Sequence, residues 1–270
     1  MRISVGQFGP FGRVEDNLAV VGRLATRAAA EGAALLVLPE ETMFTFREVE
    51  GDFAAAVDAG WDRFRTGLAA AAREHGLAIV AGGYEPSGTD RPYNTLVAVD
   101  ADGTETGTYR KLHLYDAFAH RESDLITPGD RAPAPLELAG LCVGLQTCYD
   151  LRFPEVSRAL AVAGADLLAV PAAWFAGEHK VMHWQTLLRA RAVENTVWVA
   201  AADTCSAATV GHSAILDPLA LTAAELTEEA EAVATAEVSV QRTAEVRRTV
   251  PVLAGRRTDL LAPPAPDAGR

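Results

Sequence analysis

Short apolar runs alternate with helical patterns along almost the whole of this chain. The run from Ala33 to Leu38 is entirely apolar and is followed by Pro39, which is typical of a buried strand. The segment before it, from Asp16 to Glu31, has the periodicity of an amphipathic, alanine-rich helix. Since helices that alternate with strands must cover the faces of the sheets, this pattern predicts a layered α/β fold.

The same pattern continues towards the C-terminus. We expect strands at 2–8, 77–82, 93–99, 104–109, 141–147, 166–170, 197–202, 213–216 and 233–238, and helices at 61–75, 154–163, 181–194 and 240–248. The turn from Asp100 to Gly103 predicts a hairpin, so the sheets should be mixed. Because no linker divides the chain, we predict a single domain over residues 1–262 and a flexible, proline- and alanine-rich tail at 263–270.

The chain is acidic, with 24 Lys and Arg residues against 36 Asp and Glu residues and a formal net charge of −12. Such a surface repels phosphate backbones and no basic stripe opposes it, so we expect no nucleic-acid partner. No apolar stretch approaches the roughly 20 residues needed to span a bilayer, so we expect no membrane partner. Three cysteines, an odd and sparse set, and an N-terminus without signal-peptide features predict a cytoplasmic location.

Several residues with chemically useful side chains stand where predicted strands end and loops begin. They are Glu40 after the apolar run, Lys111 after the hairpin, Glu122 in the polar loop that follows, and Cys148 at the end of the strand at 141–147. In α/β folds, ligands gather at such strand ends. Each residue taken alone is more often structural, because free cysteine is commonly a core residue and lysine and glutamate are commonly solvated.

Cys148 differs from the other two cysteines in its context. Cys142 lies inside an alternating strand and Cys205 lies in a loop of small residues, whereas Cys148 precedes a polar turn and a helix that begins at Pro154. A helix N-terminus lowers the pKa of a nearby thiol and offers N–H donors to an oxyanion. This context predicts a reactive thiol with a lowered pKa at Cys148.

A thiol hydrolase needs a base to take the thiol proton, and a cation or a pair of N–H groups to hold the oxyanion. Glutamate, lysine and cysteine supply that set without a histidine, a cofactor or a metal ion. Their combination predicts a thiol hydrolase. A catalytically silent scaffold on the same fold is the non-enzymatic alternative.

A metal-dependent hydrolase is the main rival among enzymes. His179 and His183 are four residues apart, a spacing that places two ligands on one face of a helix. The segment HKVMH lacks the glutamate of a metalloprotease motif, and no third ligand stands nearby. His113 and His120, in the loop after Lys111, have a spacing that fits no ligand pattern. We therefore expect no metal site and no cofactor.

The segments LVLPE, YRKLHLYD and CYDLRFPE, in this order, resemble the three catalytic motifs of the nitrilase, or carbon–nitrogen hydrolase, superfamily. The likeness extends roughly over residues 1–262. It implies that Glu40 is the general base, Lys111 the cation beside the oxyanion and Cys148 the nucleophile. Glu122 resembles the family's second glutamate, which positions Lys111. The backbone N–H of Tyr149 would complete the oxyanion hole.

The resemblance also implies a fold, an assembly and a kind of substrate. The family fold is an α-β-β-α sandwich with mixed sheets, and its subunits typically pair, so we expect a homodimer or higher homo-oligomer. Tyr115 and Trp174 are expected to contact the substrate. The pattern is nearest the Nit-type branch, the ω-amidases and the amidases of deaminated glutathione, which implies a small-molecule amide as substrate. Nitrilases and N-carbamoyl amino acid hydrolases share the catalytic residues and are the alternatives.

Overall fold

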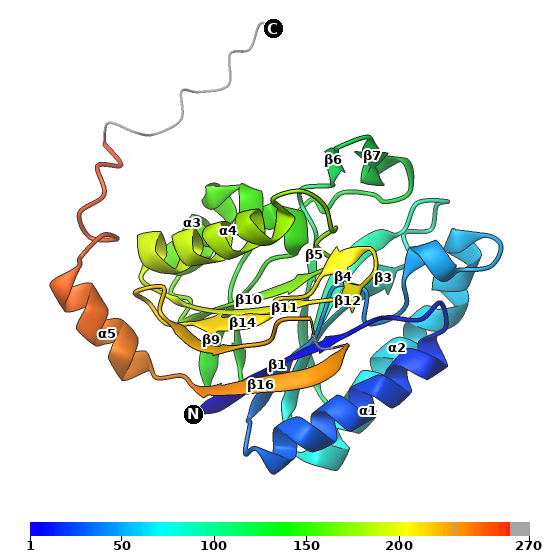
Figure 1. The fold of residues 1–270 in the computed structure, drawn as a ribbon, viewed down its shortest axis with the longest axis horizontal. Coiled ribbons are helices and arrows are strands. Elements are labelled where there is room, and N and C mark those ends of the chain that lie inside the picture. Colours follow the sequence, from blue (N-terminus) through cyan, green and yellow to red (C-terminus); the bar gives the residue numbers. More distant parts are fainter. Residues whose placement is uncertain (229, 260–270) are drawn as a thin grey trace, which may run out of the picture.

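Two six-stranded sheets pack face to face in the middle of the molecule (Figure 1). The structure is a computed structural model that describes residues 1–228 and 230–259. The first sheet contains β1 (Arg2–Phe8), β2 (Leu35–Val37), β3 (Ala78–Glu85), β4 (Tyr93–Val99), β5 (Glu105–Arg110) and β16 (Glu231–Glu237). Across the sheet the order is β16-β1-β2-β3-β4-β5. β1, β2 and β3 run parallel and the other pairs are antiparallel, so the sheet is mixed as predicted.

The second sheet is built in the same way. It contains β8 (Leu136–Leu138), β9 (Leu141–Leu145), β10 (Leu167–Ala172), β11 (Trp198–Asp203), β14 (Ala214–Leu216) and β15 (Thr222–Glu225). The order across the sheet is β15-β14-β11-β10-β9-β8. Its three central strands, β9, β10 and β11, are parallel, and antiparallel strands flank them on both sides.

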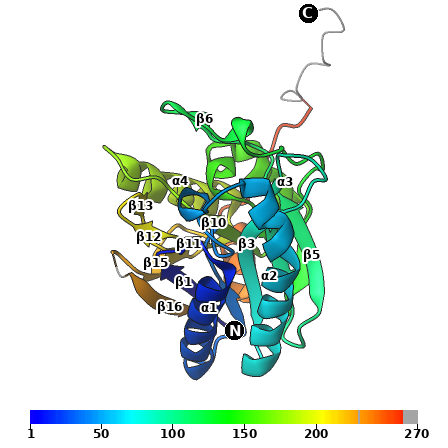
Figure 2. The ribbon, with the colours of Figure 1, turned by 90° about the vertical axis from the view of Figure 1, so that its right-hand side faces the viewer.

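Helices cover both outer faces of this pair of sheets (Figures 1 and 2). Helices α1 (Val14–Ala30) and α2 (Phe53–His75) pack on the first sheet, and α3 (Pro154–Val162) and α4 (Lys180–Asn195) pack on the second. A further helix, α5 (Val240–Thr249), follows β16. The layers are helix, sheet, sheet and helix, so the predicted α-β-β-α sandwich is confirmed.

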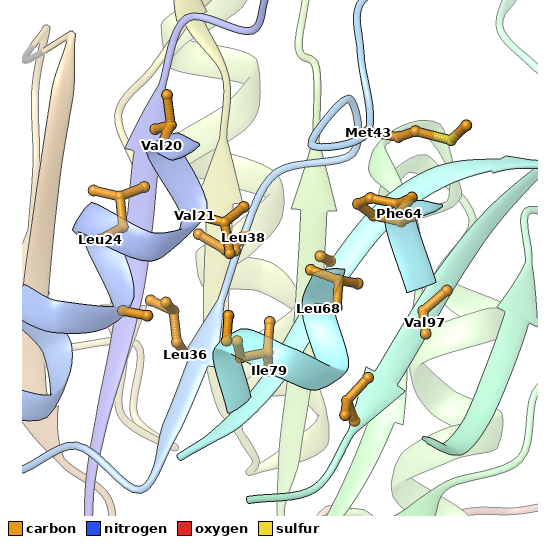
Figure 3. Close-up of a cluster of buried hydrophobic side chains, with 14 of the residues drawn as sticks. Val20, Val21, Leu24, Leu36, Leu38, Met43, Phe64, Leu68, Ile79 and Val97 are labelled. Atoms are coloured by element: carbon orange, nitrogen blue, oxygen red, sulfur yellow. The ribbon is translucent and has the colours of Figure 1, made fainter. Parts of the chain in front are cut away.

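The position of β2 explains why its sequence is apolar without a break. Leu36 packs with Val21 and Leu24 of α1 in the layer between helices and sheet (Figure 3). Its neighbours Leu35 and Val37 point the other way, into the layer between the two sheets. Because successive side chains of a strand alternate between its faces, a strand buried on both faces has no position for a polar residue.

Helix α2 begins at Phe53, whereas the sequence predicted a start at Trp61. The Asp52 side chain caps the earlier start by accepting a hydrogen bond from the Ala55 N–H at 2.7 Å. The helix ends where predicted, and Gly76 follows it in the left-handed conformation with φ 63°.

Strand β10 continues through Pro171, where the sequence predicted its end. β10 pairs with β9 only as far as Ala169, while its pairing with β11 continues to Ala172. The Ala172 carbonyl accepts a hydrogen bond from the Thr204 N–H on the side of β10 that faces β11. Because successive residues of a strand direct their backbone groups to alternate sides, Pro171 faces the β9 side, where the pairing with β9 has already ended. A missing N–H costs nothing at such a position.

Short ribbons and 3₁₀ turns complete the described chain. The ribbons are β6 (Asp116–Ala117) with β7 (His120–Arg121), and β12 (Cys205–Ser206) with β13 (Thr209–Val210); the turns are Phe46–Glu48, Glu122–Asp124 and Cys148–Arg152. None of the helices within residues 1–228 and 230–259 has the length and apolar character needed to cross a bilayer. The predicted tail at 263–270 lies outside the described residues, and the single domain over 1–262 stays a prediction.

Candidate active site

The fold brings Glu40, Lys111, Glu122 and Cys148 together in one pocket. Glu40 stands beyond the end of β2 and Lys111 directly follows β5 in the first sheet, whereas Cys148 stands beyond the end of β9 in the second. The complete lining is Glu40, Glu41, Phe46, Phe53, Tyr84, Asn94, Lys111, Tyr115, His120, Glu122, Leu125, Ile126, Cys148, Tyr149, Arg152, Ala173, Trp174, Phe175 and Lys180. The pocket is therefore shared between the two sheets.

The Lys111 ammonium lies between two carboxylates. Its Nζ donates to Glu40 Oε1 at 2.8 Å and to both oxygens of Glu122, at 3.0 and 2.8 Å. Burial alone would lower the pKa of Lys111, but the negative charges of Glu122 and Glu40 raise it well above its ordinary value. Lys111 is therefore a buried cation at neutral pH.

The Glu40 carboxylate is buried and accepts hydrogen bonds from three directions. Oε1 accepts from Lys111 and from the Asn94 amide at 2.7 Å, and Oε2 accepts from the backbone N–H of Ala173 at 2.8 Å. Burial would raise the pKa of Glu40, but the Lys111 charge and the hydrogen bonds from Lys111, Asn94 and Cys148 bring it below its ordinary value. Glu40 is therefore ionised.

Asn94 also reaches the second glutamate, a contact that sequence reasoning missed. Its amide donates to Glu122 Oε1 at 3.2 Å, and the backbone N–H of Tyr115 donates to Glu122 Oε2 at 2.6 Å. The available signal was an amide, Asn94, near the start of the strand YNTLVAV, whose second half is apolar; in the structure this amide is buried. With Lys111, Asn94 joins the two carboxylates into one network.

Cys148 begins the 3₁₀ turn Cys148–Arg152 and is 7% exposed. Burial, together with the negative charge of Glu40, raises the pKa of its thiol well above the ordinary value. The prediction of a pKa lowered by the helix at Pro154 was therefore wrong. The turn separates Cys148 from that helix, and the loss of hydration beside a carboxylate outweighs any helix-end effect. At neutral pH a thiol stands next to the Glu40 carboxylate.

The other three predicted residues, Tyr115, Tyr149 and Trp174, also line the pocket. The rings of Tyr115 and Tyr149 meet edge to face with centroids 5.0 Å apart. Both N–H groups of Trp174 are used within the protein, since its backbone donates to Asp203 Oδ1 at 2.7 Å and its indole donates to the Lys180 carbonyl at 3.0 Å. Trp174 therefore offers the pocket only the apolar surface of its ring.

Two further cations line the pocket, and sequence reasoning assigned them no role. The Arg152 guanidinium lies over the Trp174 ring at 4.8 Å, and its Nε and Nη2 are buried without a hydrogen-bond partner. Lys180 is 7% exposed and donates to the Tyr115 hydroxyl at 2.9 Å. Burial, together with the positive charge of Arg152, lowers the pKa of Lys180. Across the described ranges, neither cation has a carboxylate partner.

The histidines of the rival hypothesis do not form a common site. His113 bonds to Asp150, and His179 precedes α4 in a left-handed conformation with φ 61° instead of sharing a helical face with His183. His120 packs edge to face on Phe175. In the part of the chain that the structure describes, no three histidine, cysteine, aspartate or glutamate side chains are arranged to hold a metal ion.

Comparisons with known proteins agree with this geometry. The family model described as carbon–nitrogen hydrolase matches residues 2–248. The deaminated glutathione amidase of Escherichia coli O157:H7 is 38% identical over 265 residues, which cover 98% of this chain and 99% of that protein. The NitFhit protein of C. elegans has a similar structure, with a TM-score of 0.88 and 30% identity over 96% of this chain and 65% of that chain.

A second solved structure bears on the chemistry. It is a glutamate-to-glutamine variant of the amidase from Nesterenkonia sp. AN1, with a TM-score of 0.80 and 30% identity over 96% of this chain and 95% of that chain. Its description reports covalent addition of the acetamide moiety of fluoroacetamide at the active site cysteine of that enzyme.

A sandwich fold with a thiol, a carboxylate and an ammonium buried in one pocket has the composition of a thiol hydrolase. The family match and the identity over nearly the whole chain make the assignment specific. This chain belongs to the carbon–nitrogen hydrolase family. The predicted class of reaction, hydrolysis of a non-peptide carbon–nitrogen bond of an amide through a cysteine intermediate, is thereby confirmed.

Proposed function

We propose that this chain is an ω-amidase-like enzyme that releases ammonia from a small linear amide carrying a free carboxylate. The observation that supports this substrate class is the Arg152 guanidinium, with two nitrogens buried at the pocket and unpartnered. An unpaired buried donor is costly, and a carboxylate is the group that a guanidinium binds best. The name of the E. coli relative, deaminated glutathione amidase, supports an amide as substrate.

In this proposal Cys148 is the nucleophile and Glu40 the general base. The lowered pKa of Glu40 and the raised pKa of Cys148 leave a carboxylate beside a thiol before substrate binds. The thiol proton passes to Glu40 as the sulfur attacks the amide carbon. Negative charge then builds on the carbonyl oxygen, where the Lys111 ammonium and the backbone N–H of Tyr149 stabilise it.

Collapse of the tetrahedral intermediate returns the proton from Glu40 to the leaving nitrogen, so ammonia departs and an acyl thioester on Cys148 remains. Glu40 next takes a proton from water as that water attacks the thioester. Collapse of the second tetrahedral intermediate breaks the C–S bond, and the sulfur takes the proton back from Glu40. The product acid then leaves as a carboxylate after releasing its proton to solvent. Throughout, Glu122 holds the Lys111 ammonium through bonds of 2.8 and 3.0 Å.

In this proposal Arg152 and Lys180 bind the carboxylate end of the substrate. Burial and, next to it, the charge of Arg152 lower the pKa of Lys180, so the two cations disfavour each other in the absence of an anion. A carboxylate bound between them removes that repulsion and satisfies the free guanidinium nitrogens through paired hydrogen bonds. An uncharged substrate end would leave those donors buried and unpaired.

Ammonia release from succinamic acid and from its methyl ester tests the proposed substrate class. A charge-assisted hydrogen bond contributes about 1.5–3 kcal/mol, so kcat/KM should favour the acid by about tenfold or more. Arg152→Met should remove most of this preference and leave turnover of the ester nearly unchanged. Equal turnover of acid and ester by the parent enzyme would contradict the proposal.

The same assay decides among the alternatives. Faster turnover of a nitrile or of an N-carbamoyl amino acid would replace the proposed substrate class with a nitrilase or an N-carbamoyl amino acid hydrolase. Absence of turnover across the whole panel would instead support a catalytically silent scaffold.

We further propose that the enzyme works in the cytoplasm as a homodimer. Cys142 and Cys148 are free thiols, which suits a reducing compartment. The outer helices expose apolar side chains, with Val162 of α3 54% exposed and Met182 and Val193 of α4 52% and 44% exposed. Exposed apolar side chains on this outer layer support association with a second copy. Light scattering coupled to size-exclusion chromatography measures the mass directly, and a monomer at micromolar concentration would contradict the assembly.

A further inference from the structure

Asp150 is fully buried, and its two carboxylate oxygens together accept four hydrogen bonds. Oδ1 accepts from the backbone N–H of His113 at 3.0 Å and from its ring Nδ1 at 2.8 Å. Oδ2 accepts from the Tyr109 hydroxyl at 2.7 Å and from the backbone N–H of Thr147 at 3.0 Å. Each oxygen therefore has two donors, and the group is saturated.

These donors flank the two residues that meet at the reacting carbon in the proposed mechanism. Tyr109 and His113 stand two residues before and two residues after Lys111, and Thr147 directly precedes Cys148. Tyr109 lies in β5 of the first sheet and His113 in the loop after it, while Thr147 lies just beyond the end of β9 in the second sheet. One carboxylate is thus hydrogen-bonded both to the segment around Lys111 and to the segment around Cys148, called here the nucleophile segment.

We propose that Asp150 is a positioning residue that sets the place of the Lys111 ammonium relative to the Cys148 sulfur, an inference that rests on the proposed roles of those two residues. The nucleophile segment needs such a tie. Cys148 has φ 44°, in the left-handed region that residues with a side chain rarely adopt, and such a conformation persists only where the surroundings hold it. The tie acts on geometry and makes no contact with the reacting atoms.

The capacity of both Asp150 oxygens to accept is part of this role. Each of its oxygens faces one backbone N–H, from His113 or from Thr147, and a backbone N–H can only donate. In Asp150→Asn, either orientation of the amide would point an NH₂ group at one of these donors. The substitution preserves the shape of the side chain but removes one of the two backbone hydrogen bonds, so its effect on kcat reports on positioning and not on packing.

The first experiment compares the parent with Asp150→Asn on any amide that the parent turns over. We expect kcat to fall by about tenfold or more, because displacement of reacting groups by about 1 Å costs up to a hundredfold, while KM changes little. Alkylation of Cys148 by iodoacetamide, followed by mass spectrometry, should slow as well. Asp217→Asn is the control, since Asp217 also accepts two backbone N–H bonds, at 2.9 Å each. Asp217 follows β14, which runs antiparallel to β11, and it does not line the pocket. This substitution should lower the melting temperature and leave kcat unchanged.

A second pair of variants keeps the test decisive if Asp150→Asn does not fold. The asparagine amide nitrogen occupies nearly the place of histidine Nδ1, so His113→Asn retains a donor to Asp150 that His113→Ala loses. We expect His113→Asn to keep most of the parental kcat and His113→Ala to lose several-fold more. Equal kcat for these two variants, or a parental kcat in folded Asp150→Asn, would overturn the positioning role. If alkylation of Cys148 left the parent active, the proposed function itself would fail.

Discussion

The backbone N–H of Ala173 donates a hydrogen bond of 2.8 Å to Glu40 Oε2, across 133 positions of sequence. Ala173 follows β10 in the second sheet, whereas Glu40 stands at the edge of the first sheet. The backbone N–H of Glu40 donates in return to the Ala172 carbonyl at 3.3 Å. The proposed base is therefore oriented by the opposite sheet, and its geometry depends on how the two sheets pack.

Among the three cysteines, only Cys148 should be essential. We expect Cys148→Ala to be folded and inactive, because the thiol is the atom that forms the acyl intermediate. Cys142→Ala and Cys205→Ala should retain activity, since neither side chain lines the pocket. Ammonia release by the three purified variants checks this, with circular dichroism to verify folding. Turnover at the parental rate by Cys148→Ala would refute the mechanism.

Substitution of the two lysines of the pocket should change different kinetic constants. Lys111→Met removes the cation beside the oxyanion, and loss of such a donor costs on the order of a hundredfold or more in kcat. Lys180→Met removes a cation assigned to the substrate carboxylate, so it should raise KM for succinamic acid and change kcat little. Steady-state kinetics of both variants measure the contrast. A purely KM effect in Lys111→Met would make Lys111 a substrate-binding residue.

Glu41, next to the proposed base, should make the protein less stable as the pH rises. Its carboxyl group is 2% exposed and pairs with Arg47 at 2.8 Å. Burial raises the pKa of Glu41 to about 7 from an ordinary value of 4.5. The folded state thus binds this proton more tightly than the unfolded chain, and the resulting stability, complete below the ordinary pKa, is lost as the pH rises through about 7.

Chemical unfolding at a series of pH values tests this. Between about pH 5 and pH 8 the free energy of unfolding of the parent should fall relative to that of Glu41→Gln, by about 2–3 kcal/mol. Glu85→Gln is the control. Hydrogen bonds from Arg110 and Thr95 hold the pKa of Glu85 below its ordinary value despite burial, so that side chain should stay ionised over this range. Parallel curves for the parent and Glu41→Gln would contradict the prediction.

Gly82 should tolerate no side chain, because it packs directly beneath Glu40. A Cβ at Gly82 would collide with the Glu40 backbone, whereas a Cβ at Gly22 in helix α1 would meet nothing within 4 Å. Gly82→Ala should destabilise the fold by about 1–3 kcal/mol and lower kcat by displacing the carboxylate. Gly22→Ala should stabilise it by about 0.5–1 kcal/mol with kcat unchanged. Thermal melts and steady-state assays of both variants are sufficient, and an unaffected kcat in Gly82→Ala would show that Glu40 can shift without cost.

Sequence reasoning singled out Glu40, Lys111 and Cys148 because each stands just after a predicted strand, and ligand-binding groups gather at the ends of strands. It could not assign Asn94, whose amide reaches Glu40 only through the register of β4 beside β3. It gave the wrong sign for the pKa of Cys148, because a helix terminus is visible in the sequence, whereas burial against a carboxylate from the other sheet is a tertiary property.

The free guanidinium of Arg152 escaped prediction for a related reason. Its position inside CYDLRFPE is evident in the sequence, but the absence of a partner for Nε and Nη2 follows only from the packing around Trp174. Likewise, the helix and strand patterns predicted most element bounds closely. The sequence wrongly predicted that β10 ends before Pro171, because the effect of a proline depends on where the pairing of β9 with β10 stops.

The pairing of β1 with β16 has a consequence for biosynthesis. β1 contacts β16 along its whole length, from Arg2 opposite Glu237 to Phe8 opposite Glu231. β1 therefore keeps one edge open until β16 has been synthesised, which begins 223 residues after Phe8. At translation rates of about 5–20 residues per second this interval is roughly 10–50 s. During it, the unpaired edge of β1 is available to nascent chains on neighbouring ribosomes, which makes the time before β16 emerges the period of greatest aggregation risk.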